Sequence, residues 1–329
     1  MVKITDVAIR AGVAKSTVSN VLTGRKYVSE ELRQKVLDAC REMDFYPNFC
    51  ASSLSKRKTN ILALVMGDEN NISDYPFYGD LLVSCVAEAS SCGYSLLIYY
   101  EQDTENLLNV LRRGCAPIDG ALVMSPCVDD ERFTQLENDR VHCVSIGRPD
   151  RTGGISYVDV DNERFVYDVV KTLSQTYEGP IYLANAPKKM TISADRERGY
   201  YKACQELGRS TERGTDYYKE CSETDGYNFA KDRVQPNALF IAADAIMCRG
   251  IYRAVEEAGL RVGKDVGVFA LGKSVTEDKL DPKLSYGHQD YSQIGRLAIQ
   301  MLMEEIDSGT ARGVVYADNR LYFHESTQK

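Results

Sequence analysis

The sequence predicts an α/β protein with a small, all-helical head and a larger body of two lobes, each a parallel sheet flanked by helices. The first 47 residues contain three short helical patterns and no strand pattern. From residue 61, short apolar runs alternate with amphipathic segments, which is typical of parallel sheets covered by helices. This second stretch, about 270 residues, is too long for one sheet and one core, so two lobes are expected.

The composition is that of a soluble globular protein, with 43% hydrophobic and 27% charged residues among 329. No apolar run is longer than Ile61–Met66, whereas a membrane helix needs ~20 residues. Lys3, Asp6 and Arg10 interrupt the first segment, so no signal peptide is expected. The ten cysteines are scattered and form no C-x-x-C pair, which favours free thiols in a reducing compartment. We therefore expect a cytoplasmic protein without a membrane partner.

The net charge of −8 is unevenly distributed. Residues 1–60 hold 11 basic and 6 acidic residues, a net charge of +5, whereas the remainder holds 29 basic and 42 acidic residues. A basic head on an acidic body suggests that the head meets a polyanion and the body does not. An ordinary solvated basic face is the alternative.

Residues 1–47 predict three short helices, because apolar side chains recur in them with the helical period. Thr5 and Ser29 are expected to cap the first and third helices, and Pro47 closes the segment. A tight turn, Gly12–Ala14, separates the first two helices and predicts a helix-turn-helix, whose second helix can enter the major groove of DNA.

The outward face of the second helix is polar and has no acidic residue; it carries Lys15, Ser16, Ser19 and Asn20. Phosphates would repel carboxylates there, whereas a solvated helix face usually carries both signs. Small polar side chains can also reach the base edges in the major groove. DNA binding is therefore favoured over the alternative, a small helical bundle without a ligand.

A series of short motifs runs through the head: Ile4-Thr5-Asp6-Val7-Ala8, Ala11-Gly12-Val13, Ser16-Thr17-Val18-Ser19, Val21-Leu22, Gly24, Val28-Ser29 and Tyr46-Pro47-Asn48. In order and spacing these motifs closely resemble the DNA-binding head of the lac repressor family. The resemblance implies that bases are read by Lys15, Ser16 and Asn20. It implies that phosphates are held by Thr5, Thr17, Ser19 and Tyr27. Ala14 departs from the family's capping Ser, which weakens that N-cap by ~1 kcal/mol.

Residues 48–60 have no apolar stripe deep enough for a core helix, and their basic cluster and three serines are typical of a linker. In the lac repressor family this segment is a hinge helix that folds on DNA and pairs with its dimer partner in the minor groove. The resemblance implies that Leu54 is the apolar wedge that kinks the duplex. It also implies that Ala51 allows the two hinge helices to approach and that Lys56 contacts the DNA.

The body is expected to begin at residue 61. Its apolar runs predict strands at Ile61–Met66, Ser95–Tyr100, Ala121–Ser125, His142–Ile146, Ile181–Asn185, Ala238–Ala242 and Val266–Leu271. Its amphipathic segments predict helices at 78–92, 104–113, 162–177, 194–207, 244–258 and 290–307. In such folds a ligand binds at the carboxyl ends of the strands, in the crevice between lobes.

Catalytic chemistry is not indicated. The sequence has no phosphate-binding loop, nucleophile elbow or dinucleotide motif. Its three histidines, at 142, 288 and 324, have no neighbours at metal-ligand spacing. Carboxylate pairs such as Asp129/Asp130 and Asp159/Asp161 have the context of caps or solvated charges. No enzyme, metal or cofactor is predicted, and a binding protein is favoured.

The resemblance continues through the body and implies a periplasmic-binding-protein-like fold with three crossings between lobes, near residues 160, 288 and 318. Lobe one would span about 61–160 and 290–318, and lobe two about 161–288. Family positions in the cleft are matched by Phe77 and Tyr78, by Arg196 in Ser193-x-x-Arg196-x-x-Gly199-Tyr200, and by Asp244 and Gln289. The resemblance implies that these residues bind an effector.

The cleft also departs from the family. Sugar- and nucleoside-binding relatives usually carry acids or amides where this chain has Gly147-Arg148, Ala243 and Gly272-Lys273. Acceptors for sugar hydroxyls are thereby lost, and Arg148 and Lys273 add positive charge, so an anionic or phosphorylated effector is expected. In the alternative, Lys273 faces solvent or pairs with Asp244, and no small molecule binds.

Together these features predict a sequence-specific transcriptional regulator, a repressor, that binds a pseudo-palindromic operator as a homodimer and responds to an effector. One alternative is the same fold governed by a protein partner at the acidic surface of the body. Another is a ligand-binding or enzymatic lobe fused to an incidental helical head.

Overall fold

The computed structural model describes residues 2–23, 26–45, 58–66, 77–100, 118–151, 153–272, 279–310 and 313–329, without the side chains of Thr23 and Phe77. The chain forms two compact units, Met1–Thr59 and Asn60–Lys329, and each is considered by itself.

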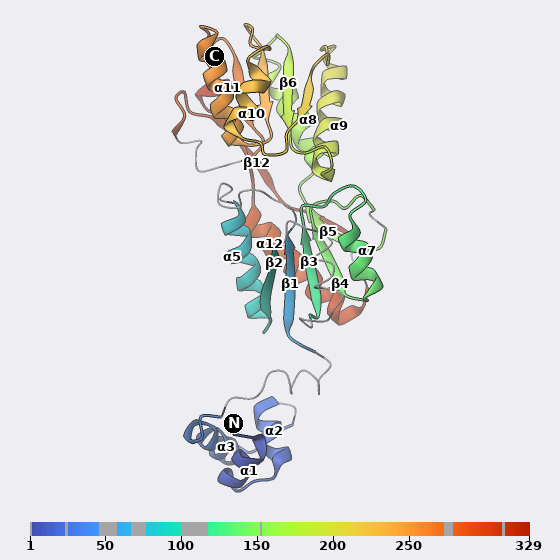
Figure 1. The fold of residues 1–329 in the computed structure, drawn as a ribbon, viewed down its shortest axis with the longest axis vertical. Coiled ribbons are helices and arrows are strands. Elements are labelled where there is room, and N and C mark those ends of the chain that lie inside the picture. The colour runs from blue at the N-terminus through green and yellow to red at the C-terminus, as the bar shows by residue number, and fades with distance from the viewer. Residues whose placement is uncertain are drawn as a thin grey trace. The chain divides into compact units, whose positions relative to one another are not determined.

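The head consists of α1 (Ile4–Ala11), α2 (Lys15–Thr23) and α3 (Glu30–Glu42) (Figure 1). The three predicted helices are therefore present. Their apolar stripes meet in one small core formed by Val7, Ala8, Val18, Val36, Ala39 and Cys40. Because Val18 is fully buried, the opposite face of α2 is turned away from the core.

The caps of the head differ from the prediction. Lys3, rather than Thr5, occupies the N-cap position of α1, and Thr5 lies exposed in the first turn. The Asp6 carboxylate, in the first turn of the helix, accepts a hydrogen bond of 2.8 Å from the Lys3 backbone N–H. A side chain within the helix thus binds the backbone of the N-cap residue. Ser29 does occupy the N-cap of α3, but its hydroxyl makes no capping hydrogen bond.

The first sheet of the body has the strand order β11-β5-β4-β3-β1-β2, and all its pairs are parallel. Its strands are β1 (Ile61–Met66), β2 (Ser95–Tyr100), β3 (Gly120–Met124), β4 (His142–Ile146), β5 (Ser156–Asp159) and β11 (Val314–Tyr316). One face packs on α5 (Phe77–Ser91) and α12 (Tyr291–Ser308), and the other on α7 (Glu131–Asn138). Alternate residues of β1 pack into the cores on the two faces of the sheet, as expected for a strand that is buried on both sides.

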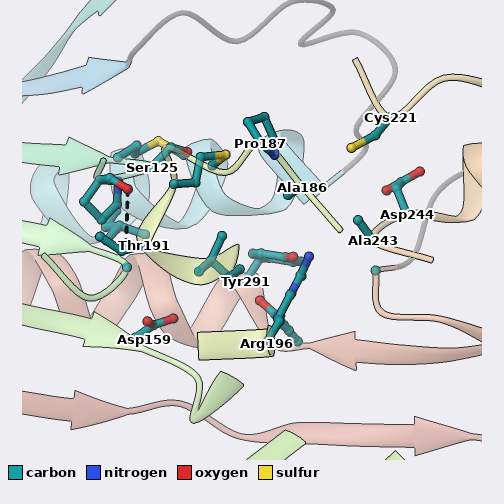
Figure 2. Close-up of a pocket in the computed structure, with 18 of the residues that line it drawn as sticks. Ser125, Asp159, Ala186, Pro187, Thr191, Arg196, Cys221, Ala243, Asp244 and Tyr291 are labelled. Atoms are coloured by element: carbon teal, nitrogen blue, oxygen red, sulfur yellow. Dashed lines mark hydrogen bonds between the residues drawn. The ribbon is translucent and has the colours of Figure 1, made fainter. Parts of the chain in front are cut away.

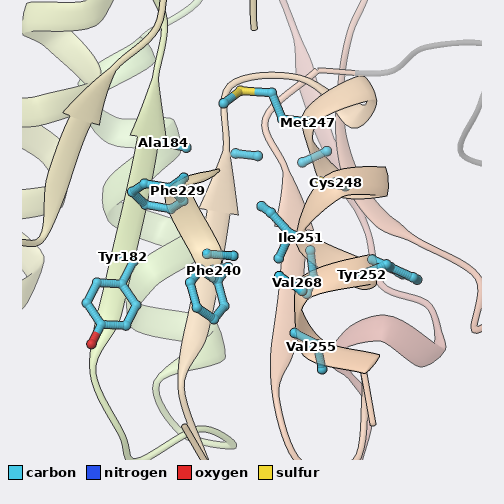
Figure 3. Close-up of a cluster of buried hydrophobic side chains, with 14 of the residues drawn as sticks. Tyr182, Ala184, Phe229, Phe240, Met247, Cys248, Ile251, Tyr252, Val255 and Val268 are labelled. Atoms are coloured by element: carbon cyan, nitrogen blue, oxygen red, sulfur yellow. The ribbon is translucent and has the colours of Figure 1, made fainter. Parts of the chain in front are cut away.

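The second sheet has the order β12-β10-β9-β8-β6-β7, in which only β12 is antiparallel to its neighbour. Its strands are β6 (Ile181–Asn185), β7 (Thr215–Tyr217), β8 (Leu239–Ala242), β9 (Gly267–Ala270), β10 (Ser285–Gln289) and β12 (Asn319–Tyr322). One face packs on α8 (Asn162–Leu173) and α9 (Thr191–Glu206). The other packs on α10 (Glu223–Ala230) and α11 (Ala245–Glu257), where Phe229, Phe240 and Ile251 meet (Figure 3).

The chain passes between the two lobes after β5, after β10 and between β11 and β12 (Figure 1). Residues 319–329, which the sequence left outside both lobes, add β12 and the short helix η3 (Glu325–Thr327) to the second lobe. Three connections leave each lobe intact while allowing the two to move about a common hinge.

The strand predictions are accurate where the runs are apolar and fail where they are not. Four predicted strands match the structure to the residue, and three differ by one residue at one or both ends. The strands missed are β5, β7, β10, β11 and β12, which are short or rich in polar residues, and the missed helices are α7 and α10. The helix predicted at 104–113 lies outside the described residues.

Helices α10 and α11 approach each other through two glycines. A Cβ atom at Gly250 would lie 1.9 Å from the Glu223 carbonyl oxygen, and one at Gly226 would lie 1.9 Å from the Met247 carbonyl oxygen. We expect Gly250→Ala to lower the free energy of unfolding by about 1–3 kcal/mol, because the helix backbones must separate. Urea denaturation measures this. Gly79→Ala, on α5 with open space around it, is the matched control and should be neutral or slightly stabilising; equal destabilisation by both would contradict this packing.

Candidate functional site

The head presents the side chains that the sequence assigns to DNA. Thr5, Lys15 and Ser16 are exposed, and Tyr27 has 95% of its surface exposed. Half-buried positions are held by Thr17, Ser19 and Asn20. The first turn of α2 contains no acidic residue, so this face has the charge that phosphates require. The predicted minor-groove residues Ala51, Leu54 and Lys56 lie outside the described residues.

The body contains a cavity of about 230 Å³ at the carboxyl ends of both sheets (Figure 2). The first lobe contributes segments that follow β3 and β4, together with the end of β5. The second lobe contributes segments that follow β6, β7, β8 and β9, and the start of α9. Most of the wall is apolar; its polar side chains are Ser125, Asp159, Thr191, Arg196, Lys219, Glu220, Asp244 and Gln289 together with Tyr78, Tyr291 and Cys221.

Arg196 is the buried cation of this cavity. Only 6% of the residue is exposed, and its guanidinium makes no hydrogen bond or ion pair within the described part of the chain, where Nε is fully buried. Burial lowers the pKa of Arg196 from its ordinary value, whereas Asp159 and Asp244 act in the opposite direction. This guanidinium has strong donors and no acceptor among the described residues.

The motif around Arg196 has a structural explanation in α9. A Cβ atom at Gly199 would lie 2.1 Å from the Glu163 carbonyl oxygen, so glycine allows α9 to touch α8. The Tyr200 hydroxyl donates a 2.7 Å hydrogen bond to the Ile181 carbonyl oxygen, and Asn185 donates a 2.9 Å hydrogen bond to the Ser193 carbonyl oxygen. These contacts fix α9 against β6 and hold Arg196 at the cavity wall.

Two aspartates also line the cavity. Burial raises the pKa of Asp159 to about 6. Its oxygens accept hydrogen bonds from the backbone N–H groups of Val160 and Arg148, at 2.7 and 2.9 Å, and from Asn162 Nδ2 at 3.0 Å. Asp244 is the N-cap of α11 and accepts a 2.8 Å hydrogen bond from the Ile246 N–H.

The expectation that Arg148 binds the effector needs correction. Its guanidinium pairs with Asp195 in bidentate geometry, with Nε–Oδ2 and Nη2–Oδ1 distances of 2.8 Å each, and Arg148 does not line the cavity. Gly147, with a φ of 104°, turns the chain here, and a Cβ atom on it would lie 2.8 Å from Pro126 Cδ. Because Asp195 belongs to α9, the structure assigns Arg148 to a contact between lobes.

Other contacts reinforce this connection, which we call the lobe bridge: the Arg148–Asp195 pair and the hydrogen bonds between segments 126–128 and 189–191. The Thr191 hydroxyl donates to the Arg148 carbonyl oxygen at 2.6 Å. The N–H groups of Val128 and Thr191 donate to the carbonyl oxygens of Lys189 and Pro126, at 2.8 and 3.2 Å. The lobe bridge therefore holds the two lobes together on one side of the cavity.

The remaining predicted cleft residues are placed as follows. Tyr78 and Gln289 line the cavity, whereas Lys273 and the side chain of Phe77 lie outside the described residues. Sequence reasoning missed Asp195, Thr191, Cys221 and Tyr291. No local signal identifies Asp195, because its partner Arg148 is 47 residues away.

Over the described ranges, no group of three or more His, Cys, Asp or Glu side chains is arranged to hold a metal ion. The helices described are also too short or too polar to cross a bilayer.

Comparisons with known proteins cover both units. Residues 3–48 match the bacterial regulatory proteins of the lacI family, and residues 173–327 match the periplasmic binding protein-like domain. The chain is 25% identical to catabolite control protein A of Priestia megaterium over 99% of each chain. It is 26% identical to the HTH-type transcriptional regulator RegA of Clostridium saccharobutylicum over 92% of this chain and 91% of that protein.

Solved structures of similar fold agree with these sequence matches. A complex of the transcriptional regulator CelR with cellobiose is 26% identical, with a TM-score of 0.75 over 99% of this chain and 100% of that one. The lac repressor dimer bound to operator and the anti-inducer ONPF shares the fold, with 19% identity and a TM-score of 0.86 over 100% and 99% of the two chains. The predicted fold class is confirmed, and these relatives are regulators rather than enzymes. The head of the chain thus matches the lacI family of bacterial regulatory proteins and its body matches the periplasmic binding protein-like domain, and the chain is a DNA-binding transcriptional regulator with an effector-binding body.

Proposed function

We propose that this regulator is a cytoplasmic repressor that binds a pseudo-palindromic operator as a homodimer and responds to a small molecule carrying an anionic group. The observation that supports the effector is Arg196, whose buried guanidinium lies at the wall of a cavity and has no hydrogen bond or ion pair with any other described residue. Effector and operator affinities are then coupled reciprocally, by about 1–3 kcal/mol. A formed cavity with converging polar groups favours a small molecule over control by a protein partner alone.

An anionic group would supply Arg196 with a compensating charge and with hydrogen-bond acceptors. A guanidinium keeps its charge even when buried, and a carboxylate or phosphate can accept two of its hydrogen bonds at once. The same wall contains Gly147, Ala243 and Gly272, which offer no side-chain acceptors for the hydroxyls of a neutral sugar. The structure of CelR contains cellobiose, a neutral sugar, so the two regulators would differ in effector class.

The head would read DNA with the side chains that the resemblance indicates. We infer base contacts by Lys15, Ser16 and Asn20 in the major groove, since Lys15 and Ser16 are exposed on α2 and Asn20 is half-buried. Phosphates would be held by Thr5, Thr17, Ser19 and Tyr27. In the hinge segment, the minor groove would be contacted by Ala51, Leu54 and Lys56.

Exposed apolar side chains at one edge of the first lobe support the homodimer. Helix α5 exposes 69% of Val83 and 45% of Val86, and the edge strand β2 exposes Leu97, Ile98 and Tyr100 by 37 to 46%. An exposed edge strand with apolar side chains calls for a cover in a soluble protein. A second copy of this chain, related by a two-fold axis, would supply it and would place two heads on the two halves of the operator.

Calorimetry with matched neutral and phosphorylated sugars tests the effector class. We expect the phosphorylated sugar to bind about 10- to 100-fold more tightly than the neutral one, since a charged hydrogen bond contributes about 1.5–3 kcal/mol. Arg196→Ala should abolish that preference. Arg164→Ala is the control, because Arg164 is an exposed side chain of the same lobe. Tight binding of the neutral sugar without a gain from phosphate would reject an anionic effector.

A further inference from the structure

Residues 125–128, which we call the crossing segment, belong both to the effector cavity and to the contact between lobes. Ser125 and Pro126 line the cavity, and so does Thr191 of the second lobe (Figure 2). The Thr191 N–H donates to the Pro126 carbonyl oxygen at 3.2 Å. Cys127 pairs with Met190 of the second lobe in an antiparallel bridge. The same short stretch of backbone therefore shapes the cavity and joins the lobes.

The backbone around the crossing segment has an unusual conformation. Ser125 and Asp129 have φ angles of 50° and 53°, in the left-handed region that residues with a side chain rarely adopt. Such conformations persist only where the surrounding structure holds them. The crossing segment therefore requires a support from its own lobe.

A bidentate ion pair at the start of α7 provides this support. Arg132 donates to Asp130 through Nε–Oδ1 and Nη2–Oδ2 hydrogen bonds of 2.8 and 2.6 Å. Arg132 Nη2 also donates to the Ser125 carbonyl oxygen at 3.1 Å. Asp130 Oδ2 accepts a hydrogen bond of 3.1 Å from the Cys127 N–H. The pair thus holds the crossing segment at its first and third residues.

Both side chains of this pair are buried, with 5% of Arg132 and 6% of Asp130 exposed. Burial acts to raise the pKa of the Asp130 carboxyl, but the hydrogen bonds and the charge of Arg132 lower that pKa below its ordinary value. Loss of either partner would leave a buried charge uncompensated, which is strongly unfavourable. Neither residue is part of the cavity wall formed by the described residues.

We propose that Asp130 and Arg132 are positioning residues of the effector site, which hold the crossing segment in the conformation that lines the cavity and bonds to the second lobe. Closure of the lobes around the cavity then depends on two side chains outside its wall. This inference concerns the cavity itself and applies whether or not the effector is anionic.

Hydrogen–deuterium exchange of the full-length protein tests the inference at the Thr191 N–H, with the amides of β6 as the reference. Arg132→Met removes the donors and keeps an apolar stem of similar length. We expect Thr191 to exchange about 10- to 100-fold faster relative to β6, because hydrogen bonds to a charged group are lost. Since Thr191 belongs to the second lobe, a defect confined to the start of α7 would not change its exchange.

Asp130→Asn separates the positioning role from helix capping. Asp130 is the N-cap of α7 and accepts a 3.1 Å hydrogen bond from the Arg132 N–H, and Asn is an equivalent cap. The helix start is therefore kept, whereas the charge and one acceptor are lost. Thr191 should still exchange about 10-fold faster, and the double variant Asp130→Asn/Arg132→Met should show less than the combined effect of the two single changes.

Arg233→Met is the matched control in the second lobe. The side chain of Arg233 is 9% exposed and donates to Asp216 and to the Phe229 carbonyl oxygen, at 2.6 Å each. The same kinds of hydrogen bond are therefore lost at a position outside the cavity wall formed by the described residues. Arg233→Met should lower the stability to urea but leave the exchange of Thr191 relative to β6 unchanged.

Two results would overturn the inference. Unchanged relative exchange at Thr191 in Arg132→Met and Asp130→Asn would reduce the pair to a feature of α7, and an equal increase in Arg233→Met would show general loosening of the body. If Arg132→Met does not fold, Arg132→Lys decides the question. Its ammonium group keeps the charge but not the planar fork that binds Asp130 and Ser125 together, so exchange at Thr191 should still rise; no rise in the folded Arg132→Lys variant would reject the proposal.

Discussion

The operator affinity of the dimer is expected to fall by about 10³- to 10⁵-fold between 50 and 200 mM salt, the loss that 6–10 neutralised phosphates produce. Residues 1–60 carry 11 basic side chains, and two heads bring twice that number to the DNA. Each neutralised phosphate releases counterions, so the logarithm of affinity falls linearly with that of salt concentration. Fluorescence anisotropy with a labelled operator measures the slope.

Two variants distinguish phosphate contacts from base contacts in the same assay. Lys56→Ala should weaken binding to all sequences alike and reduce the salt slope by about one. Asn20→Ala should change the preference at particular base pairs and leave the slope unchanged. A flat response to salt would contradict the assignment of this face of the head to DNA.

The second large effect is expected at the lobe bridge. Removing one partner of a buried ion pair costs about 3–5 kcal/mol, and the exposure of the Arg148 side chain, 22%, places this pair at the lower end. Arg148→Met should therefore favour separation of the lobes, since the Asp195 side chain is 93% buried and, among the described residues, keeps only Arg198 as an ion-pair partner. The N–H groups of Val128 and Thr191, which donate across the lobes, should exchange with deuterium about 100-fold faster.

Two matched variants test whether this effect is specific to the Arg148–Asp195 pair. Arg164→Met removes an exposed pair with Asp168 in the second lobe and should change exchange little, because such pairs contribute about 0.3–0.5 kcal/mol. The double variant Arg148→Met/Asp195→Asn should cost less than the sum of the two single changes, as expected for residues in contact. Unchanged exchange at Val128 and Thr191 in Arg148→Met would show that the pair does not hold the lobes.

Much of the fold follows from the sequence because its signals are local. The helices of the head follow from the period of their apolar residues, and β1, β2, β4 and β6 match the predicted runs to the residue. Strands β1 and β6 are buried on both faces and must be apolar at successive positions, so their limits are visible in the chain. The motif from Ser193 to Tyr200 likewise identified Arg196 in the cavity wall.

Strands with weak local signals depended on the tertiary structure. Three-residue strands such as β7 and β11, and the polar strand β10, are defined by neighbours that complete their hydrogen bonds. The cap of α1 was also misplaced, because the helix begins at Ile4, with Lys3 at the N-cap position and its N–H bonded to the Asp6 carboxylate. Hydrogen bonding and burial against distant strands, rather than propensity, decided these elements.

The sequence alone thus determined the helical head, the order of the long strands and the presence of an arginine in the cleft. Only the tertiary structure decided which partners the charged side chains of the cleft region have. Both Arg148 and Arg196 were expected in the cleft, but Arg148 meets Asp195 across the lobes, whereas Arg196 is buried and has no hydrogen bond or ion pair within the described residues. The difference arises from contacts between segments far apart in the chain, and the energy of a charge depends on its burial and on the groups around it.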